Sequence, residues 1–368
     1  LNKTMLSLVL TVIIVALIFE YINGFHDTAN SIATTVATKA LSPRNAIILA
    51  TVTNLFGALV GTAVAKTISS GLVDATYVTS TTIICALLGG IVWNLVTWWY
   101  GLPSSSSHAM IGGLLGATLA SAHDNWHSII WMKDKGGVWF KNDGVFYKVF
   151  VPMISSPVLG LICGFLLMAI LYFVLEKVYH ADWTQKLFGK LQLISSGYMG
   201  FAHGSNDAQK VMGIIALTLM AANKAGDLQN TPTWLEFLKH PMVTSADGTQ
   251  TIAPWIVITC ALVMAAGTAA GGWKIIHTLG TKLVDLKPVH GFAAETTGAS
   301  ILLLAAKLGM PVSTTHAITT SIMGVGLAKK DDEGKSVCFG TAGRILFAWV
   351  LTIPATFLIA YVLRKVTM

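Results

Sequence analysis

Charged residues are scarce in this sequence, since Asp, Glu, Lys and Arg together make up only 11% of its 368 residues. Hydrophobic residues account for 54%, and the mean hydropathy is +0.68. A surface with so few charges cannot keep a chain of this length in solution, whereas a lipid bilayer solvates apolar side chains. The composition therefore excludes an ordinary soluble domain and indicates an integral membrane protein.

Paired cysteines and a basic stripe are also lacking. The four cysteines stand singly, with no spacing typical of a disulfide, metal or redox pair, and we expect packing roles for Cys85, Cys163, Cys260 and Cys338. The net charge is +7, but the basic residues mostly flank apolar stretches, as membrane topology signals do. This distribution excludes nucleic acid as a partner. A positive surface would still raise the local concentration of an anionic substrate.

Long apolar stretches are what the sequence has instead. Each is close to the roughly 20 residues that cross about 30 Å of hydrocarbon. They lack the two-residue alternation of barrel strands, so helices are expected. The first has no small-residue cleavage site, which favours a mature helix over a signal peptide. The stretches are Met5 to Ile22, Ala46 to Val64, Ile83 to Tyr100, Val149 to Leu175, Ile252 to Trp273, Phe292 to Leu308 and Ile345 to Val362.

Two motifs occur twice. A carboxylate motif at Gly24–Asn30 returns at Gly204–Lys210, and a hydroxyl-rich motif at Gly101–Ala109 returns at Gly309–Ala317. Each motif interrupts or follows an apolar stretch, which is how membrane transporters build a polar site between repeats. The pattern predicts two related halves and favours transport.

We expect a first membrane repeat over residues 1–175, a polar linker over 176–190 and a second membrane repeat over 191–368, with a polar loop at 225–251. Some apolar pieces after the motifs are short, which suggests incomplete crossings. Inverted halves must each cross an odd number of times. The predicted fold is therefore an all-α integral membrane protein with two inverted-topology repeats, broken or re-entrant helices and about ten transmembrane crossings.

The carboxylate motifs place Asp27 and Asp207 inside apolar sequence, with Asn30 and Asn206 nearby. A carboxylate in hydrocarbon costs several kcal/mol unless it is neutralised, solvated or paired. Either aspartate alone would also serve as a helix N-cap at a water-exposed end. Two of them at equivalent repeat positions favour an ion or substrate site.

The hydroxyl motifs follow prolines and precede apolar helical sequence, a composition typical of a helix N-terminus. Such an end offers unpaired N–H groups and partial positive charge, which suit a tetrahedral oxyanion. A single serine would satisfy an ordinary cap, and these runs exceed that need. The candidate anion ligands are Ser104, Ser105, Ser106, Ser107, Ser313, Thr314 and Thr315.

Two such N-termini, facing each other across the pseudo-twofold axis, would hold one anion, while the aspartates would repel it unless a cation or proton accompanied it. This is a physical argument for symport. His26 and Glu295 are further candidates for the coupling role, as are Glu20 and the histidines at 108, 203 and 316. Lys210 would either pair with Asp207 or contact the anion.

At these residues the sequence resembles the inorganic phosphate transporter family, in particular its bacterial low-affinity branch. The resemblance rests on four ordered motifs, Asn23–Asn30, Gly101–His108, His203–Lys210 and Gly309–His316. It implies orthophosphate held between inverted halves in a bacterial inner membrane and moved by alternating access with a cation. Carried over, the substrate and ion site falls on the aspartates, asparagines and hydroxyl residues named above.

One departure from the family pattern concerns the coupling ion. Many relatives have Asn directly before the first motif aspartate, whereas His26 stands here, and only the second half keeps Asn206 before Asp207. The resemblance therefore implies a proton rather than sodium, without excluding sodium bound at Asp27, Asn206 and Asp207. No cofactor is expected, and no resident metal is firmly assigned.

Other functions were weighed against phosphate symport. A sulfate permease of the same fold stays open, because sulfate is also tetrahedral. An intramembrane aspartyl protease would be an enzyme, but its Gly-x-Gly-Asp motif is absent, since Phe25 and His26 separate Gly24 from Asp27. A passive anion channel would need no carboxylates at its site. The sequence neither shows nor forbids phosphate carried as a divalent-metal complex, and it leaves a homo-oligomer open.

Overall fold

The computed structural model describes residues 2–176, 181–244, 248, 250–329 and 336–368. The first half contains six helices, α1 (Asn2–Ala37), α2 (Pro43–Ala58), α3 (Ala63–Ser70), α4 (Ser80–Trp99), α5 (Ser106–Ser121) and α6 (Val151–Glu176). The second half contains α7 (Ala181–Ala225), α8 (Pro254–Ala270), α9 (Trp273–His277), α10 (Pro288–Lys307), α11 (Thr314–Leu327) and α12 (Phe339–Val366).

Short elements join these helices. The 3₁₀ turns are η1 (Ala75–Tyr77), η2 (Trp126–Ser128), η3 (Trp139–Lys141) and η5 (Thr233–Lys239), and the π-helical turns are η4 (Phe146–Phe150) and η6 (Thr278–Lys282). One antiparallel hairpin pairs β1 (Met242–Thr244) with β2 (Gln250–Ile252), with Val243 opposite Thr251. The hairpin and η5 occupy the predicted polar loop.

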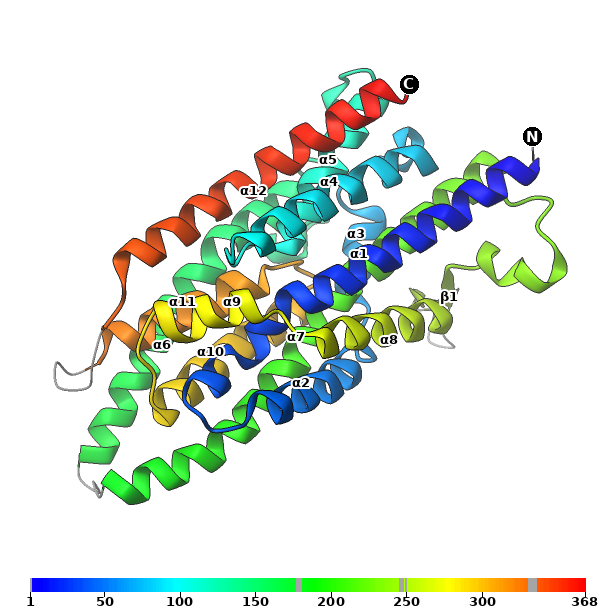
Figure 1. Cartoon of the computed structure of the whole chain (residues 1–368). Helices are drawn as coiled ribbons and strands as arrows, with labels where there is room; N and C mark the ends of the chain where they lie inside the picture. Colours follow the sequence, from blue (N-terminus) through cyan, green and yellow to red (C-terminus); the bar gives the residue numbers. More distant parts are fainter. Residues whose placement is uncertain (1, 177–180, 245–247, 249, 330–335) are drawn as a thin grey trace.

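The two halves run in opposite directions (Figure 1). The helix α1 starts at the end of the molecule where the N-terminus lies, whereas its repeat equivalent α7 ends there. Likewise α6 runs away from that end and α12 runs towards it, up to the C-terminus. This antiparallel relation confirms the predicted inverted-repeat, all-α architecture.

The short apolar pieces after the carboxylate motifs continue the helices α1 and α7, and those after the hydroxyl motifs form α5 and α11. Broken helices lie elsewhere. The pair α2 and α3 bends by 65°, and α8 and the segment Trp273–Lys282 bend by 62°. Five helices in the described part of the chain are long and apolar enough to cross a membrane, or seven spans if each bent pair is one. The 45-residue α7 is not in that count and is also long enough to cross, and a total of about ten crossings is compatible with this set of helices.

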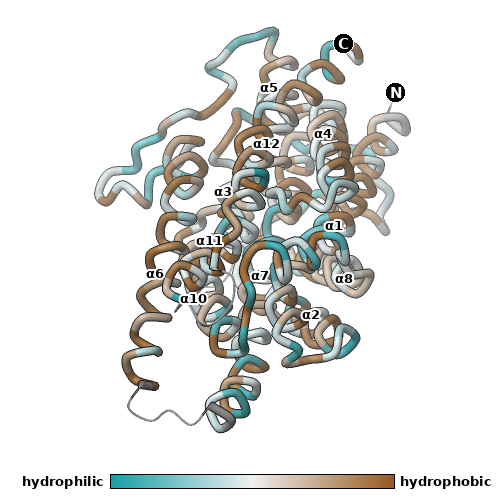
Figure 2. The backbone as a smooth tube through the Cα atoms, turned by 60° about the vertical axis from the view of Figure 1, so that its left-hand side comes forward, coloured by the Kyte–Doolittle hydropathy of each residue, from teal (hydrophilic) through white to brown (hydrophobic). Residues whose placement is uncertain are grey.

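The helices α6 and α12 consist largely of apolar residues (Figure 2). Only 17% of the apolar window of α6 and 28% of that of α12 are buried within the protein. In contrast, α5 is buried along almost its whole length, from Ser106 to Ala120. Helices with exposed apolar faces therefore surround a core that contains the hydroxyl motifs.

The carboxylate motifs differ from the sequence expectation in one respect. Residues 24–30 and 204–210 lie inside the continuous helices α1 and α7, with no break at either motif. No proline follows either aspartate within its helix, so the backbone hydrogen bonds continue through the polar residues. Neither Asp27 nor Asp207 is a helix N-cap, and the capping interpretation is excluded.

The predicted linker at residues 176–190 falls partly outside the described residues, which omit 177–180. Its residues from Ala181 onward form the first turns of α7.

Candidate functional site

The four motifs meet at the centre of the molecule. The carboxylate motifs lie in the middle of α1 and α7, and the hydroxyl motifs form the N-terminal ends of α5 and α11. All nine residues predicted to bind the anion are at least 95% buried, as are His26, Asp27, Asp207 and Glu295. Segments far apart in the sequence thus bring a dense set of polar groups into an apolar protein.

The two hydroxyl motifs begin their helices in the same way. Ser105 is the N-cap of α5 and accepts a hydrogen bond from the His108 N–H at 3.2 Å, and Ser313 caps α11 through the His316 N–H at 3.1 Å. Each hairpin turn also has a glycine at φ +63°, Gly101 before α5 and Gly309 before α11. Glycine adopts this left-handed conformation without steric cost, which lets α4 and α10 end sharply.

These two helix starts lie against each other. The Ser107 hydroxyl donates to the Val312 carbonyl at 3.3 Å. The His108 and His316 rings meet edge to face, with centroids 4.8 Å apart. Two positive helix ends therefore converge, an arrangement that favours an anion between them.

The first aspartate belongs to a chain of hydrogen bonds. His26 Nδ1 lies 2.6 Å from an Asp27 oxygen, and His26 Nε2 lies 3.2 Å from the Thr97 hydroxyl. The Thr97 hydroxyl is 2.8 Å from that of Ser104. An imidazole thus connects the carboxylate to the first hydroxyl motif.

The second aspartate is bound by a lysine. Lys210 donates to one oxygen of Asp207 and also to the Ser107 hydroxyl. The other Asp207 oxygen accepts a hydrogen bond from Thr314 at 3.3 Å. Lys210 therefore pairs with Asp207, one of the two roles left open by the sequence, and it also contacts the first hydroxyl motif.

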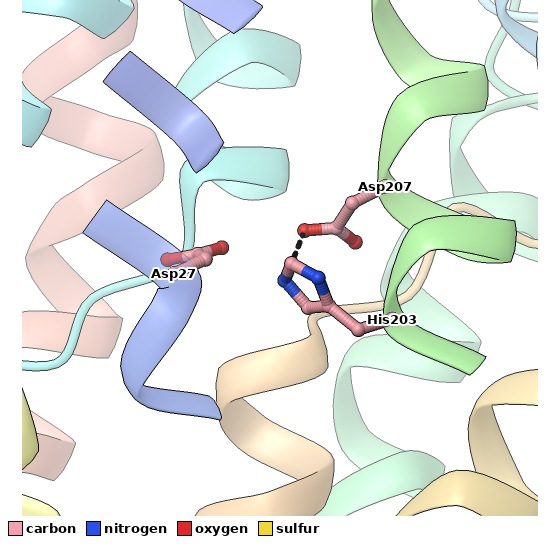
Figure 3. Close-up of side chains that lie close together, drawn as sticks. All are labelled: Asp27, His203 and Asp207. Carbon is pink, nitrogen blue, oxygen red and sulfur yellow. Dashed lines mark ion pairs between the residues drawn. The ribbon is translucent and has the colours of Figure 1, made fainter. Parts of the chain in front are cut away.

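Asp27, His203 and Asp207 form a compact cluster (Figure 3). One ligand atom from each lies within 4.8 Å of the others, and His203 Nε2 is 3.4 Å from an Asp207 oxygen. The other ring nitrogen of His203 lies 2.9 Å from the Asn54 amide oxygen. Two carboxylates and an imidazole at this separation have the donor chemistry for a small cation or a shared proton.

Several buried polar atoms at this site have no protein partner. The Ser106 hydroxyl and both amide atoms of Asn206 make no hydrogen bond among the described residues. The Asn30 amide, in contrast, donates to Thr314 at 3.1 Å and to Thr315 at 2.9 Å. Because buried polar groups are nearly always paired, the free atoms are those expected to bind a ligand or water.

Glu295 lies in a separate polar cage. One of its oxygens accepts hydrogen bonds from Thr34 at 2.5 Å, Thr35 at 2.8 Å and Gln192 at 3.2 Å. The other accepts from Ser195 at 2.5 Å. The cage joins α1, α7 and α10, and within the part of the chain that the structure describes Glu295 makes no hydrogen bond or ion pair with either aspartate.

Two residues of the site, Thr97 and Asn54, were not predicted from the sequence. Thr97 joins His26 to Ser104, and Asn54 orients His203. Both are polar residues within apolar stretches, Ile83 to Tyr100 and Ala46 to Val64, that also contain other polar residues. A polar residue in hydrocarbon was the available signal, but it did not distinguish these two from their neighbours.

Known proteins resemble this chain over nearly its whole length. A sequence profile described as "Phosphate transporter family" matches residues 23–184 and again residues 174–360. A "Probable low-affinity inorganic phosphate transporter" of Bacillus subtilis is 42% identical over 352 residues, covering 95% of this chain and 94% of that protein. A protein of the same description from Rhizobium meliloti is 41% identical over 359 residues, with 96% and 94% covered.

A solved structure has the same fold. A protein structure described as "The sodium-dependent phosphate transporter" aligns with a TM-score of 0.77 over 98% of this chain and 99% of that one. The sequences are 21% identical, so this likeness concerns the arrangement of helices alone.

Proposed function

Because this chain belongs to the phosphate transporter family, we propose that it imports inorganic phosphate across a bacterial plasma membrane by symport with a cation. A proton is favoured over sodium as the coupling ion. The proposed cycle is alternating access, in which the inverted halves expose the central site to each side of the membrane in turn. The curated relatives are named as transporters, in agreement with the prediction that the chain is not an enzyme.

The observation that carries this proposal is the meeting of two helix N-termini beside two carboxylates. In the proposed site, phosphate contacts the residues at 104–107 and 313–315 together with Asn30 and Asn206. The unpaired Ser106 hydroxyl and Asn206 amide are available to it. Lys210 supplies a full positive charge next to Ser107.

The carboxylates explain why a cation must accompany the anion. Two unit negative charges 4.8 Å apart, the outer limit of the cluster, repel each other by at most about 3.5 kcal/mol at an effective dielectric of about 20, and the Lys210 ammonium offsets part of the Asp207 charge. A phosphate anion added nearby increases this repulsion. A proton or cation taken up by the cluster removes most of it, so that anion and cation bind together more readily than either alone.

Histidines beside both aspartates favour a proton as that cation. His26 contacts Asp27 directly, and His203 approaches Asp207. Imidazole exchanges protons near neutral pH, so each pair could pass a proton between ring and carboxylate. If sodium is coupled instead, we place it at Asp27, Asn206 and Asp207.

The test is uptake of labelled phosphate into proteoliposomes under an imposed pH or sodium gradient. We expect accumulation driven by an inward proton gradient in sodium-free buffer. Accumulation driven only by sodium would overturn the proton assignment and leave symport intact. Equilibration without accumulation under either gradient would indicate a channel, and full inhibition by an excess of sulfate would indicate a sulfate permease.

A further inference from the structure

A lysine-lined cavity of about 360 Å³ lies apart from the central site. It is bounded by α3, by the polar segment between α5 and α6, and by the end of α10. Five lysines and one carboxylate, that of Asp143, line it, which gives a formal charge of +4. We call it the lysine vestibule, and its cationic residues are Lys66, Lys135, Lys141, Lys148 and Lys307.

Most of this charge is not neutralised by the protein. Lys135 pairs with Asp143 at 2.6 Å. Among the described residues, no carboxylate lies within 4.0 Å of Lys66, Lys141 or Lys307. Three ammonium groups around one cavity repel each other and create a positive potential that attracts an anion.

One lysine of the vestibule is buried and fixed. Lys148 is only 4% exposed, and its ammonium donates to the Phe140 and Leu308 carbonyls, each at 3.0 Å. An ammonium has three N–H donors, so one remains for a ligand. Lys148 also caps the C-terminal end of α10 and so ties the vestibule wall to the second half.

The floor of the vestibule leads to the central site. Thr67 and Gly309 line the cavity, and the Thr67 hydroxyl donates to the Gly309 carbonyl at 2.7 Å. Gly309 stands at the turn that leads, four residues later, to Ser313, the N-cap of α11. An anion in the vestibule would therefore be separated from the hydroxyl motif by this turn.

We infer that the lysine vestibule is a second, outer binding site for a phosphate group, which holds the anion before it enters the central site. Positive charge gathered in a concave site focuses the field and raises the local anion concentration. Free phosphate and the headgroup of an anionic lipid share this chemistry. The inference rests on the proposed function only for the identity of the transported anion.

The first experiment measures amine labelling of the native protein in nanodiscs of neutral lipid, with and without inorganic phosphate. We expect phosphate to slow acetylation of Lys66, Lys141 and Lys307 by about threefold at low ionic strength. The exposed Lys186 and Lys190 at the start of α7 serve as internal controls and should be unaffected. A parallel arm replaces neutral lipid by phosphatidylglycerol and omits phosphate.

Protection in the phosphate arm identifies the free anion as the ligand. Protection only in the anionic-lipid arm identifies the headgroup and overturns the role of the vestibule as a site that phosphate occupies before the central one. Absence of protection in both arms overturns the inference. This measurement needs no transport. If phosphate protects the lysines of a protein that fails to accumulate phosphate, the proposed function is contradicted and binding of an anion in the vestibule is still supported.

The second experiment compares uptake kinetics of K66Q/K141Q/K307Q with those of K186Q/K190Q. We expect the vestibule variant to raise the KM for phosphate about fivefold at low salt with kcat unchanged, an effect that shrinks in high salt. The control variant should keep both constants. A vestibule variant with the native KM at low salt, in a transporter that accumulates phosphate normally, would refute the outer site.

Discussion

At the scale of single residues, the aspartates of the two halves have different partners. Asp27 is bound by a histidine, which can be neutral or charged, whereas Asp207 is bound by Lys210. The repeated motifs predicted that both carboxylates share one site. The asymmetry is also present in the motifs, because His26 directly precedes Asp27 and Lys210 follows Asp207 by three residues in the same helix. What the motifs could not predict is that Lys210 also contacts Ser107 and that Thr314 donates to Asp207, because these contacts follow from the packing of α7 against the hairpins.

Asp27→Asn should abolish gradient-driven uptake while leaving the folded protein in the membrane. The amide preserves the volume of the side chain but removes the charge and the proton acceptor. Uptake into proteoliposomes measures the effect, and Asp124→Asn, at an exposed acid outside the site, is the control. Normal accumulation by the Asp27 variant would remove this residue from the coupling step.

Asp207→Asn should destabilise the protein by about 3–5 kcal/mol, because it leaves the buried Lys210 ammonium without its carboxylate. The double variant D207N/K210M should recover much of this loss, since it removes both charges. Thermal unfolding in detergent compares the single variants D207N and K210M with the double variant. Strictly additive losses would contradict a direct pair.

Neighbouring serines should separate stability from affinity. Ser105 caps α5, so Ser105→Ala should cost about 1 kcal/mol of stability. The Ser106 hydroxyl has no partner among the described residues, so Ser106→Ala should weaken phosphate binding and leave the melting temperature unchanged. Calorimetric binding and thermal unfolding of both variants check this. Native affinity in the Ser106 variant would contradict a substrate contact.

At the scale of elements, the broken helices hold the hairpin tips of the opposite half. Thr67, in α3, donates to the Gly309 carbonyl, and Thr278, in η6, donates to the Gly101 carbonyl at 2.8 Å. The sequence predicted an apolar stretch of full length at each of these positions, Ala46 to Val64 and Ile252 to Trp273, but not the bends of 65° and 62°. Only tertiary contacts decide whether an apolar stretch forms one straight helix or two helices joined by a bend.

Thr67→Val should loosen the tip of the α10–α11 hairpin. Losing one hydrogen bond worth about 1 kcal/mol raises the population of an open tip about fivefold. A cysteine introduced by Val312→Cys, in a background without the exposed Cys163 and Cys338, should then react faster with a thiol reagent.

The matched control for this variant is Thr278→Val, which breaks the equivalent bond at the other tip. It should leave the labelling rate of the Val312→Cys probe unchanged. Equal acceleration by both variants would show a general loosening rather than a local one.

At the scale of the whole molecule, composition and repeats predicted the membrane, the helices and the inverted halves. The lipid-facing α6 and α12 and the buried α5 follow directly from where apolar and polar residues fall. The continuity of α1 and α7 through their aspartates did not follow. Polar residues in a membrane helix lower its apparent length, and only the packed structure shows that neighbouring side chains satisfy them.

The reciprocal threonine bonds have a consequence for biosynthesis. Thr278 is synthesised long after Gly101, so the first hairpin enters the bilayer before its brace exists. The tip of that hairpin can settle only once the second half has been inserted. The fold is therefore completed only when both halves are in the membrane. A chain that ends after the first half would keep a polar hairpin tip without its hydrogen-bond partner Thr278.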